Sequence, residues 1–423
     1  MLNNSRYQTY IQILKEELVP AMGCTEPIAL SYCASKARDI LQAKPERCLV
    51  EVSGNIIKNV KSVIVPNTNG LKGIEAAVAA GIIAGNANKV LEVISNVNAG
   101  DIIKIRDFLD NHRIEVKPID SEHLLDIKVT LFNGDDYVAV RIVDLHTNII
   151  LIEKNHDILF SKKSKKYNNE IVINRGELNV ADIFEFANIV KITDIQEVIK
   201  RQIDYNSAIA KEGLNNEYGA NIGKVLLNIK NDIITRAKAM AAAGSDARMS
   251  GCDLPVVINS GSGNQGLTVS LPVIEYAKEL EVDDDKLYRA LVLANLIAIH
   301  QKTGIGRLSA YCGAVSAGCA AGCGIAYLCG GDYQCIAHTI VNSLAITSGI
   351  ICDGAKSSCA AKIAASVDAG ILGYKMYLQG QEFKDGDGIV VKGVENTINN
   401  VARLGKIGMK ETDKEIIRIM TKC

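Results

Sequence analysis

Hydrophobic residues recur with the spacing of amphipathic helices over residues 6–41, near the beginning of the chain. The loop PAMGCTEP, residues 20–27, interrupts this pattern with one glycine and two prolines. Thr25 is suited to cap the second helix, because Pro27 would then stand in its first turn. The pattern therefore predicts two helices joined by a short loop.

From about residue 48 the pattern becomes strand-like and rich in β-branched residues. The runs CLVEVSGNI and VKSVIVP indicate strands, and the run GIEAAVAAGIIAG indicates a helix. The run IKVTLFNGDDYVAVRIV indicates a hairpin that turns at Asn133 and Gly134, and HTNIILIEKNHDILF adds further strand. This stretch is expected to form an α+β module.

The polar run SKKSKKYNNE, residues 161–170, has the composition of a solvated linker, and beyond about residue 175 nearly every segment has a helical pattern. The first 42 residues are too few to bury a core alone, so we expect them to complete the helical domain. The predicted parts are residues 1–42, an α+β module at 43–170 and a helical catalytic domain at 171–423. The fold class is α+β, with a large mainly α-helical domain and an inserted α/β sandwich-like module.

The composition is that of a globular protein, because 48% of the residues are hydrophobic and 22% are charged. The formal net charge is −1, so no overall field would attract nucleic acid or an anionic membrane. No secretory signal pattern begins the chain, which favours a cytoplasmic location. Residues 308–331 carry no charge but are mostly small, so we expect a helix buried in protein rather than in lipid.

The chain has twelve cysteines, and seven of them lie between Cys312 and Cys359. A reducing compartment disfavours disulfides, and cysteines in apolar patterns are ordinarily small buried hydrophobes. Structural zinc is weakly supported, because the short pair Cys319 and Cys323 has no second pair of matching spacing. The density of thiols nevertheless suggests a metal or a reaction, and an iron–sulfur cluster can draw its thiolate ligands from distant segments.

The ligands of an iron–sulfur cluster must converge on one small volume. Cys352 and Cys359 suit this demand, because the loop DGAKSS between them has small residues that can fold around an inorganic core. A third ligand must come from elsewhere, and Cys312, Cys319 and Cys323 share one helical face. The first two of these would be about 10 Å apart on a straight helix. Spacing alone does not choose among the three.

Several motifs together carry a family resemblance. They are GCTEPIALSYCASKAR, AMAAAGSDARMSGCDLPVVINSGSGNQG, TGIGRLSAYCGAVSAG, CDGAKSSC and the C-terminal DGIVVKGVENTINNVARLG. With these motifs the chain resembles the L-cysteine desulfidase family, which is similar in turn to the iron–sulfur L-serine dehydratases. The resemblance implies a [4Fe–4S] cluster held by Cys312, Cys352 and Cys359. It also implies that Cys24 is a catalytic cysteine near the fourth iron.

Three protein ligands would leave one iron open to the sulfur of L-cysteine. Removal of the α-proton would then expel sulfide, and the resulting aminoacrylate would hydrolyse to pyruvate and ammonia. Cys24 is the expected base, because a helix N-terminus and a nearby cation favour a thiolate. Two alternatives stay open, in which Cys24 ligates the open iron at rest or is simply a packed loop thiol.

The segment INSGSGNQGLTVSLP, residues 258–272, interleaves polar side chains with glycines before a helix. Such a segment offers hydrogen-bond donors to an anion, so we expect it to bind the substrate carboxylate. The expected contacts are Ser260, Ser262, Asn264 and Gln265. Asn55, in the α+β module, is expected to reach the substrate across an interdomain cleft, although a turn would explain it equally well.

Three further features of the sequence each allow two interpretations. Asp246 and Arg248 could form an ion pair that shapes the site, or could lie in a surface turn. Cys423 could reach the open iron from a flexible tail, or belong to a disordered terminus. Pyridoxal phosphate is a rival cofactor, because residues 258–272 resemble a carboxylate-binding loop of its β-eliminases. Lys238, however, lacks the usual local setting of a Schiff-base lysine.

The sequence therefore predicts a homodimeric lyase that converts L-cysteine into pyruvate, ammonia and hydrogen sulfide. The nearest alternative is an L-serine dehydratase, but those enzymes tend to have a Ser-His-Thr loop where this chain has GCTEP. A non-catalytic iron–sulfur or sulfur carrier would need neither the polar loop nor a second module. The expected partner is a small amino acid, with neither nucleic acid nor membrane involved.

Overall fold

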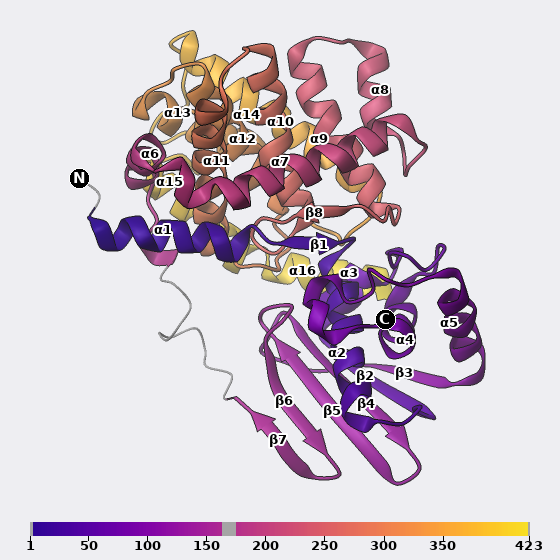
Figure 1. The fold of residues 1–423 in the computed structure, drawn as a ribbon. Coiled ribbons are helices and arrows are strands. Elements are labelled where there is room, and N and C mark those ends of the chain that lie inside the picture. The colour runs from indigo at the N-terminus through magenta and orange to yellow at the C-terminus, as the bar shows by residue number, and fades with distance from the viewer. Residues whose placement is uncertain (1–2, 163–174, 422–423) are drawn as a thin grey trace.

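The computed structural model describes residues 3–162 and 175–421, and it contains a mainly helical part and a smaller part built on a six-stranded sheet (Figure 1). This arrangement confirms the predicted α+β fold with a large helical domain. Cys423 lies outside the described residues. Among the helices of these two ranges, none has both the length and the apolar character needed to cross a membrane.

The sheet has the strand order β3–β2–β4–β5–β6–β7. Strands β2 and β3 run parallel, and each other neighbouring pair is antiparallel. The predicted hairpin is confirmed, because Asn133 at the end of β4 lies opposite Asp136 at the start of β5. The strands are β2 (Arg47–Val52), β3 (Arg113–Pro118), β4 (Asp126–Asn133), β5 (Asp136–Val143), β6 (Ile149–Lys154) and β7 (Asp157–Ser161).

The predicted strand VKSVIVP is wrong. Its first residue ends the helix α3 (Gly54–Val60), and the rest contributes an isolated bridge between Ile64 and Lys72. Strand β2 already has a partner along each edge, so no edge beside it is free for another strand. Val63 packs instead with Cys24 and Met249, toward the helical part.

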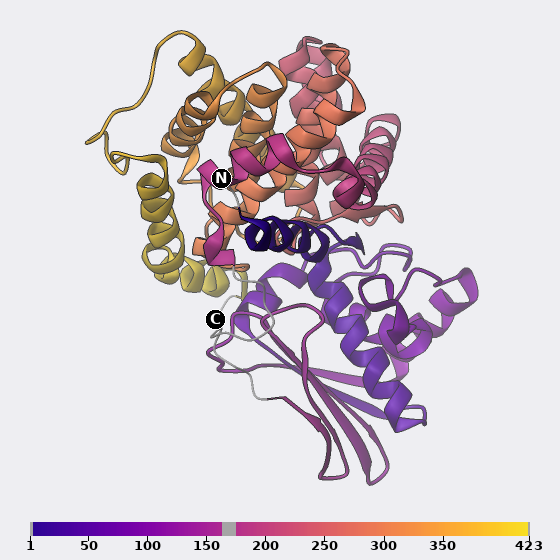
Figure 2. The same ribbon diagram turned by 60° about the vertical axis from the view of Figure 1, so that its left-hand side comes forward.

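Helices cover one face of the sheet (Figure 2). Helix α2 (Thr25–Leu41) packs on β4 and β5, α4 (Gly73–Ala84) packs on α2, and α5 (Ala99–Asn111) packs on α4. A Cβ at Gly81 of α4 would lie 2.2 Å from the carbonyl oxygen of Ser31, so only glycine permits this close approach to α2.

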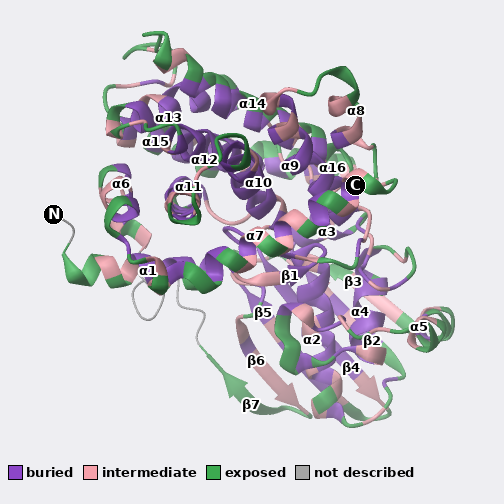
Figure 3. Ribbon diagram, turned by 45° about the horizontal axis from the view of Figure 1, so that its top comes forward, coloured by how far each residue is buried: buried purple, intermediate pink, exposed green. Residues whose placement is uncertain are grey.

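The helical part has α12 at its centre, between α10, α11, α13 and α14, and Figure 3 shows the purple of buried residues along α12. The uncharged stretch 308–331 is thus a buried helix, as predicted. The helices of this part are α6 (Val180–Ile189), α7 (Ile192–Asn215), α8 (Ile222–Ile229), α9 (Ile233–Met249), α10 (Gly263–Glu279), α11 (Asp284–Ile305), α12 (Gly313–Leu328), α13 (Tyr333–Thr347), α14 (Ser358–Leu378) and α15 (Val394–Arg403). The last helix of the chain is α16 (Lys410–Thr421). Short helical turns are η1 (Ala87–Glu92), η2 (Arg175–Glu177) and the π-helical η3 (Leu404–Gly408).

Helices α12 and α14 run parallel and very close together. A Cβ at Gly318 would lie 2.4 Å from the backbone of Ser366, and a Cβ at Gly322 would lie 2.4 Å from the backbone of Gly370. Both contacts have the same offset in sequence, so the two helices run in the same direction. Their N-termini therefore lie at the same end of the pair.

The first 42 residues contribute one helix to each part of the molecule. Helix α1 (Asn4–Glu17) packs with α7, whereas α2 packs on the sheet. Between them, β1 (Pro20–Met22) pairs antiparallel with β8 (Pro255–Val257). The N-cap of α2 is Cys24 rather than the predicted Thr25, because the Thr25 hydroxyl instead donates to the Gly261 carbonyl at 3.0 Å.

The C-terminal helix α16 returns to the sheet part and packs on α3. The buried ammonium of Lys58 on α3 forms an ion pair with Asp413 of α16, with 2.5 Å between Nζ and Oδ1. The same ammonium lies 3.5 Å from the carbonyl oxygen of Cys352. This one lysine thus links both parts of the molecule and the loop that carries Cys352.

Replacing Asp413 by alanine should lower the free energy of unfolding by about 3 kcal/mol, because it leaves the Lys58 ammonium buried without its partner. The double replacement Lys58→Met and Asp413→Leu should recover most of this loss. Denaturant unfolding followed by circular dichroism measures both changes. Glu411→Ala, which removes an exposed ion pair on the same helix, is the control and should change stability by less than about 1 kcal/mol. Equal stability of the Asp413 variant and the unaltered protein would contradict the link.

Candidate active site

The backbone brings Cys312 and Cys352 together from segments forty residues apart. Tyr311 and Ile351 form an antiparallel bridge. The Cys312 N–H donates to the Ile350 carbonyl at 3.1 Å, and the Cys352 N–H donates to the Ala310 carbonyl at 2.6 Å. Cys312 is also the N-cap of α12, so it lies beside the loop that leads into α14.

Cys359 lies in the first turn of α14, at the same end as Cys312. Burial raises the pKa of the Cys359 thiol, and the neighbouring Cys352 raises it further. Burial likewise raises the pKa of Cys312 to about 12, with contributions from Cys352 and Cys359. These mutual effects indicate that the three thiols face one common region.

Cys319 and Cys323 lie apart from this region, inside the helical core. The Cys319 sulfur lies 3.3 Å from the amide nitrogen of Gln301 and 3.9 Å from the Ile340 carbonyl. The Cys323 sulfur contacts the Ile336 carbonyl at 3.9 Å. The tertiary structure thus distinguishes Cys312 from its two companions on the helix, which the spacing did not.

The three thiols form a donor set whose chemistry suits an iron–sulfur cluster. Within residues 3–162 and 175–421, no three His, Cys, Asp or Glu side chains converge closely enough for a single metal ion. A cluster spreads its irons over a larger volume, so its ligands need not meet at one point. The buried Lys302 ammonium also faces Cys312 and Cys352. Burial lowers its pKa to about 8, although the two thiols act in the opposite direction.

Cys24 lies beside this donor set. Its side chain is 1% exposed and packs with Val63 and Met249, and Cys359 packs against the same group. Burial raises the pKa of the Cys24 thiol to about 12, although the Arg248 guanidinium acts to lower it. The expected helix N-terminus and cation are both present, but they do not outweigh burial, so the thiol is protonated at neutral pH.

The 258–272 loop separates its predicted contacts into two groups. Asn264 accepts a hydrogen bond from Arg248 at 3.1 Å, and its amide nitrogen lies 3.6 Å from the Met249 sulfur. Gln265 lies against Gly313, where a Cβ would come within 2.5 Å of its amide carbon, and its Oε1 has no described hydrogen-bond partner. Asn264 therefore lies near Met249, which packs with Cys24, and Gln265 lies beside Gly313, which follows Cys312.

Ser260 and Ser262 are placed differently. The Ser260 hydroxyl donates to Asn259 at 2.9 Å, within a buried amide network that includes Asn295. Ser262 is the N-cap residue of α10, and its side chain makes no capping hydrogen bond. Ser260 thus has a partner within its own loop, whereas the Ser262 hydroxyl has none at the helix terminus.

Asn55 lies on α3 of the sheet part, and its buried Oδ1 has no partner among the described residues. The sequence did not indicate two neighbours from the same part, Asn59 and His146. Asn59 donates to the Glu26 carboxylate at 3.1 Å, and His146 Nε2 lies 3.9 Å from it. Burial would raise the pKa of Glu26, but His146 and Arg248 lower it overall. Glu26 belongs to the GCTEP motif, whereas His146 lies in a loop that carries no motif.

Asp246 and Arg248 form neither an ion pair with each other nor a surface turn, because both are buried residues of α9. Asp246 accepts a hydrogen bond from the Ile222 N–H at 2.7 Å, at the start of α8, and burial raises the pKa of its carboxyl to about 6. Arg248 is buried, its Nη1 donates to Asn264, and its Nε has no partner among the described residues. Gly263 makes room for it, because a Cβ there would lie 2.3 Å from Arg248 Nε.

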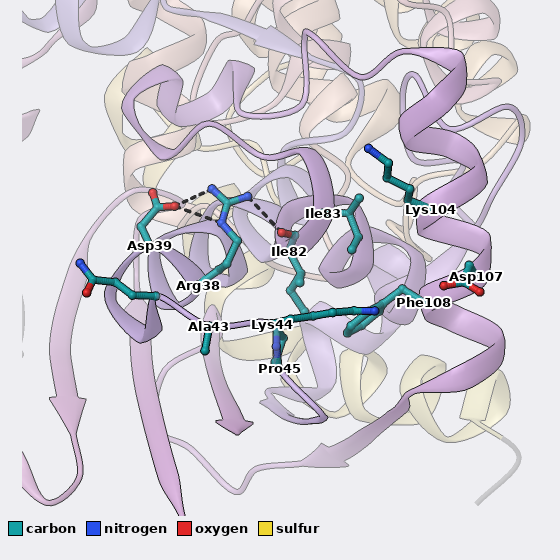
Figure 4. Close-up of a pocket in the computed structure, with 11 residues that line it drawn as sticks. Arg38, Asp39, Ala43, Lys44, Pro45, Ile82, Ile83, Lys104, Asp107 and Phe108 are labelled. Carbon is teal, nitrogen blue, oxygen red and sulfur yellow. Dashed lines mark hydrogen bonds and ion pairs between the residues drawn. The ribbon is translucent and has the colours of Figure 1, made fainter. Parts of the chain in front are cut away.

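A pocket of about 660 Å³ lies elsewhere, on the sheet part (Figure 4). Arg38, Lys44 and Lys104 line it, but the Arg38 guanidinium already pairs with Asp39 and donates to the Ile82 carbonyl. None of the predicted site residues lines this pocket. It is therefore separate from the cysteine site.

Comparison with known proteins assigns the chain to a family. A model of the family described as serine dehydratase alpha chain matches residues 161–418. The chain belongs to this serine dehydratase alpha chain family. The match covers the segments that carry Arg248, Gln265 and the three clustered cysteines.

Other relatives of this serine dehydratase alpha chain family member are similar to it over nearly its whole length. A UPF0597 protein of Desulfitobacterium hafniense is 63% identical over 98% of this chain and 96% of its own length. UPF0597 proteins of Lachnoclostridium phytofermentans and Treponema denticola are 52% and 46% identical, over 98% and 100% of this chain and 99% of each relative. The sheet part and its junction with the helices are thus common to these relatives.

The pKa of Cys24 gives a pH prediction for the cluster-free protein. Below the pKa the thiolate fraction rises about tenfold per pH unit, so iodoacetamide should alkylate Cys24 at a rate that still climbs between pH 8 and 10. Peptide mass spectrometry measures the rate at this one residue. The same residue in urea-unfolded protein is the control, and its rate should level off about one pH unit above the ordinary pKa of about 8.5. A plateau below pH 9 in the folded protein would show that its thiolate is stabilised.

Proposed function

We propose that this lyase-family protein is a [4Fe–4S]-dependent L-cysteine desulfidase, which converts L-cysteine into pyruvate, ammonia and hydrogen sulfide. One observation carries the proposal: the bridge between Tyr311 and Ile351 sets Cys312 beside Cys352, with Cys359 and Cys24 in the same region. Family membership supports an iron–sulfur lyase. A cytoplasmic location and a homodimer, both expected from the sequence, complete the proposal.

In this proposal Cys312, Cys352 and Cys359 hold the cluster. When bound, the cluster supplies a Lewis acid at the β-substituent of the substrate. The chain supplies the other functions. Asn264 orients the Arg248 guanidinium, and the burial of Cys24 excludes water from the thiol.

Cys24 is the proposed base for the α-proton. A thiol whose pKa is about 12 becomes a strong base once it is ionised, which suits a weakly acidic C–H bond. The resting-ligand role also needs the thiolate, so in both roles Cys24 first loses its proton. Arg248, which acts to lower this pKa, favours that loss.

The second candidate is an L-serine dehydratase, which the description of the matched family favours. The loop GCTEP, with a cysteine at position 24, favours L-cysteine. A non-catalytic carrier is less well supported. Unpartnered buried oxygens at Asn55, Asn59 and Gln265 suit a small polar ligand, which a carrier does not need.

Replacing Cys312, Cys352 or Cys359 by alanine should abolish the brown colour of anaerobically purified protein, because each loss removes one cluster ligand. Visible absorbance and iron content measure this result. Cys319→Ala is the matched control, since Cys319 lies on the same helix as Cys312 but packs in the core. Full colour in all three ligand variants would refute the ligand assignment.

Replacing Cys24 by alanine should retain the colour and lower sulfide release by about 10²–10⁴-fold, the range expected for losing a general base. Sulfide and pyruvate assays measure this loss. The same assays with L-cysteine and L-serine decide between the two substrates. A Cys24 variant with full activity would remove this residue from the mechanism.

A further inference from the structure

We propose that Arg248 and Glu26 form a clamp for the two charged groups of an α-amino acid, in which Arg248 binds the carboxylate and Glu26 binds the ammonium. This inference rests on the proposed function in taking an amino acid as the substrate. It assigns residues that the sequence left undecided or without a catalytic role. It also specifies the substrate class as a zwitterion that carries both charged groups.

Arg248 is a buried cation prepared for an anion. Its side chain is 3% exposed, and the hydrogen bond described for its guanidinium goes to the neutral amide of Asn264 rather than to a carboxylate. Its Nη1 donates to Asn264, whereas its Nε has no described partner. A buried charge is costly unless it is paired, so a ligand anion at this position would relieve the cost. The planar guanidinium can hold a carboxylate through two parallel hydrogen bonds.

The fold packs the Arg248 side chain against Gly263, which is the first residue of α10. Because a Cβ at Gly263 would lie 2.3 Å from Arg248 Nε, the guanidinium occupies space that only glycine leaves open. The N-terminus of a helix of this length adds positive potential for an anion. Arg248 also influences the thiols of Cys24 and Cys359, so an anion bound to it would lie beside the proposed catalytic centre.

Glu26 supplies the opposite charge in the same region. Its carboxylate accepts a hydrogen bond from Asn59 at 3.1 Å, and the Thr25 hydroxyl, which donates to the Gly261 carbonyl, lies 3.2 Å from it. The bond from Asn59 orients it. Its ion pair with His146 is long, with 3.9 Å between Nε2 and Oε1, and needs a protonated imidazole. Arg248 acts on Glu26 electrostatically without forming an ion pair with it. The two charges are therefore near one another, and neither is paired with the other.

Unpartnered oxygens favour an ammonium at the Glu26 end. Asn59 uses its amide nitrogen on Glu26, which leaves its buried Oδ1 without a partner beside the carboxylate. The Oδ1 of Asn55, on the same helix, and the Oε1 of Gln265 are also buried and unpartnered. These atoms are all acceptors, and an α-ammonium group offers three N–H donors.

Two thiol probes separate the two ends of the clamp. The molecule 3-mercaptopropionate keeps the carboxylate and thiol of cysteine but lacks the ammonium, and cysteamine keeps the ammonium and thiol but lacks the carboxylate. Isothermal titration calorimetry with anaerobic, cluster-loaded protein measures the binding of each probe. Because both probes carry the same thiol, they differ only in the charged group.

Arg248→Gln should weaken binding of 3-mercaptopropionate by about thirtyfold or more and change that of cysteamine by less than about threefold. Glu26→Gln should give the reverse pattern. Arg248→Lys should restore part of the carboxylate binding, because it restores the charge without the planar fork. The controls are Arg236→Gln and Glu279→Gln, which remove an exposed ion pair that includes another arginine of α9.

Gly263→Ala keeps the arginine but pushes its guanidinium aside, and it should weaken 3-mercaptopropionate selectively if Arg248→Gln does not fold. Equal weakening of both probes by either folded variant, or no weakening, would overturn the clamp. Sulfide and pyruvate assays on the unaltered protein test the proposed function separately. If the assays show no lyase activity, the calorimetry can still show selective binding of the two probes. If the calorimetry shows no selective binding, the assays can still show lyase activity.

Discussion

The close parallel contact between α12 and α14 is the constraint on which the candidate site depends. At Gly318 and Gly322 of α12, a single added carbon would collide with the backbone of α14. Two helices in such contact can neither slide nor separate without losing their packing, because protein interiors are dense. The contact thus fixes the offset between the helices. This offset carries Cys312 and Cys359 to the same end of the pair, where the Tyr311–Ile351 bridge adds Cys352.

At this end of the helix pair, burial affects the pKa values of the thiols more than the helix dipoles do. Cys24 and Cys312 are N-cap residues, and a helix N-terminus typically stabilises an anion by about 0.3–2 kcal/mol. Raising the pKa of Cys24 from 9.0 to about 12 corresponds to roughly 4 kcal/mol against the thiolate. Desolvation therefore exceeds the dipole effect, and the thiol is neutral until a stronger positive charge acts on it.

The site is shared between the two parts of the molecule. The helical part supplies the clustered thiols, Arg248 and Gln265, whereas the sheet part supplies Asn55, Asn59 and His146. Segment β1 and helix α16 join the parts from the two ends of the chain. Both sides carry buried oxygens without described partners, which a small polar ligand would satisfy under the proposed function.

Local pattern was sufficient for the hairpin at Asn133, the buried helix at 308–331 and the α+β class, because periodicity depends on neighbours in sequence. It failed for VKSVIVP, since strand formation needs a free sheet edge that only the assembled sheet reveals. Spacing left Cys312, Cys319 and Cys323 equivalent as ligands. Only the packing of α12 against α14 and the bridge at Tyr311 distinguished Cys312, because contacts between distant segments depend on which surfaces fit together. For the same reason Arg248 was ambiguous in sequence, where neither its burial nor its hydrogen bond to Asn264 is visible.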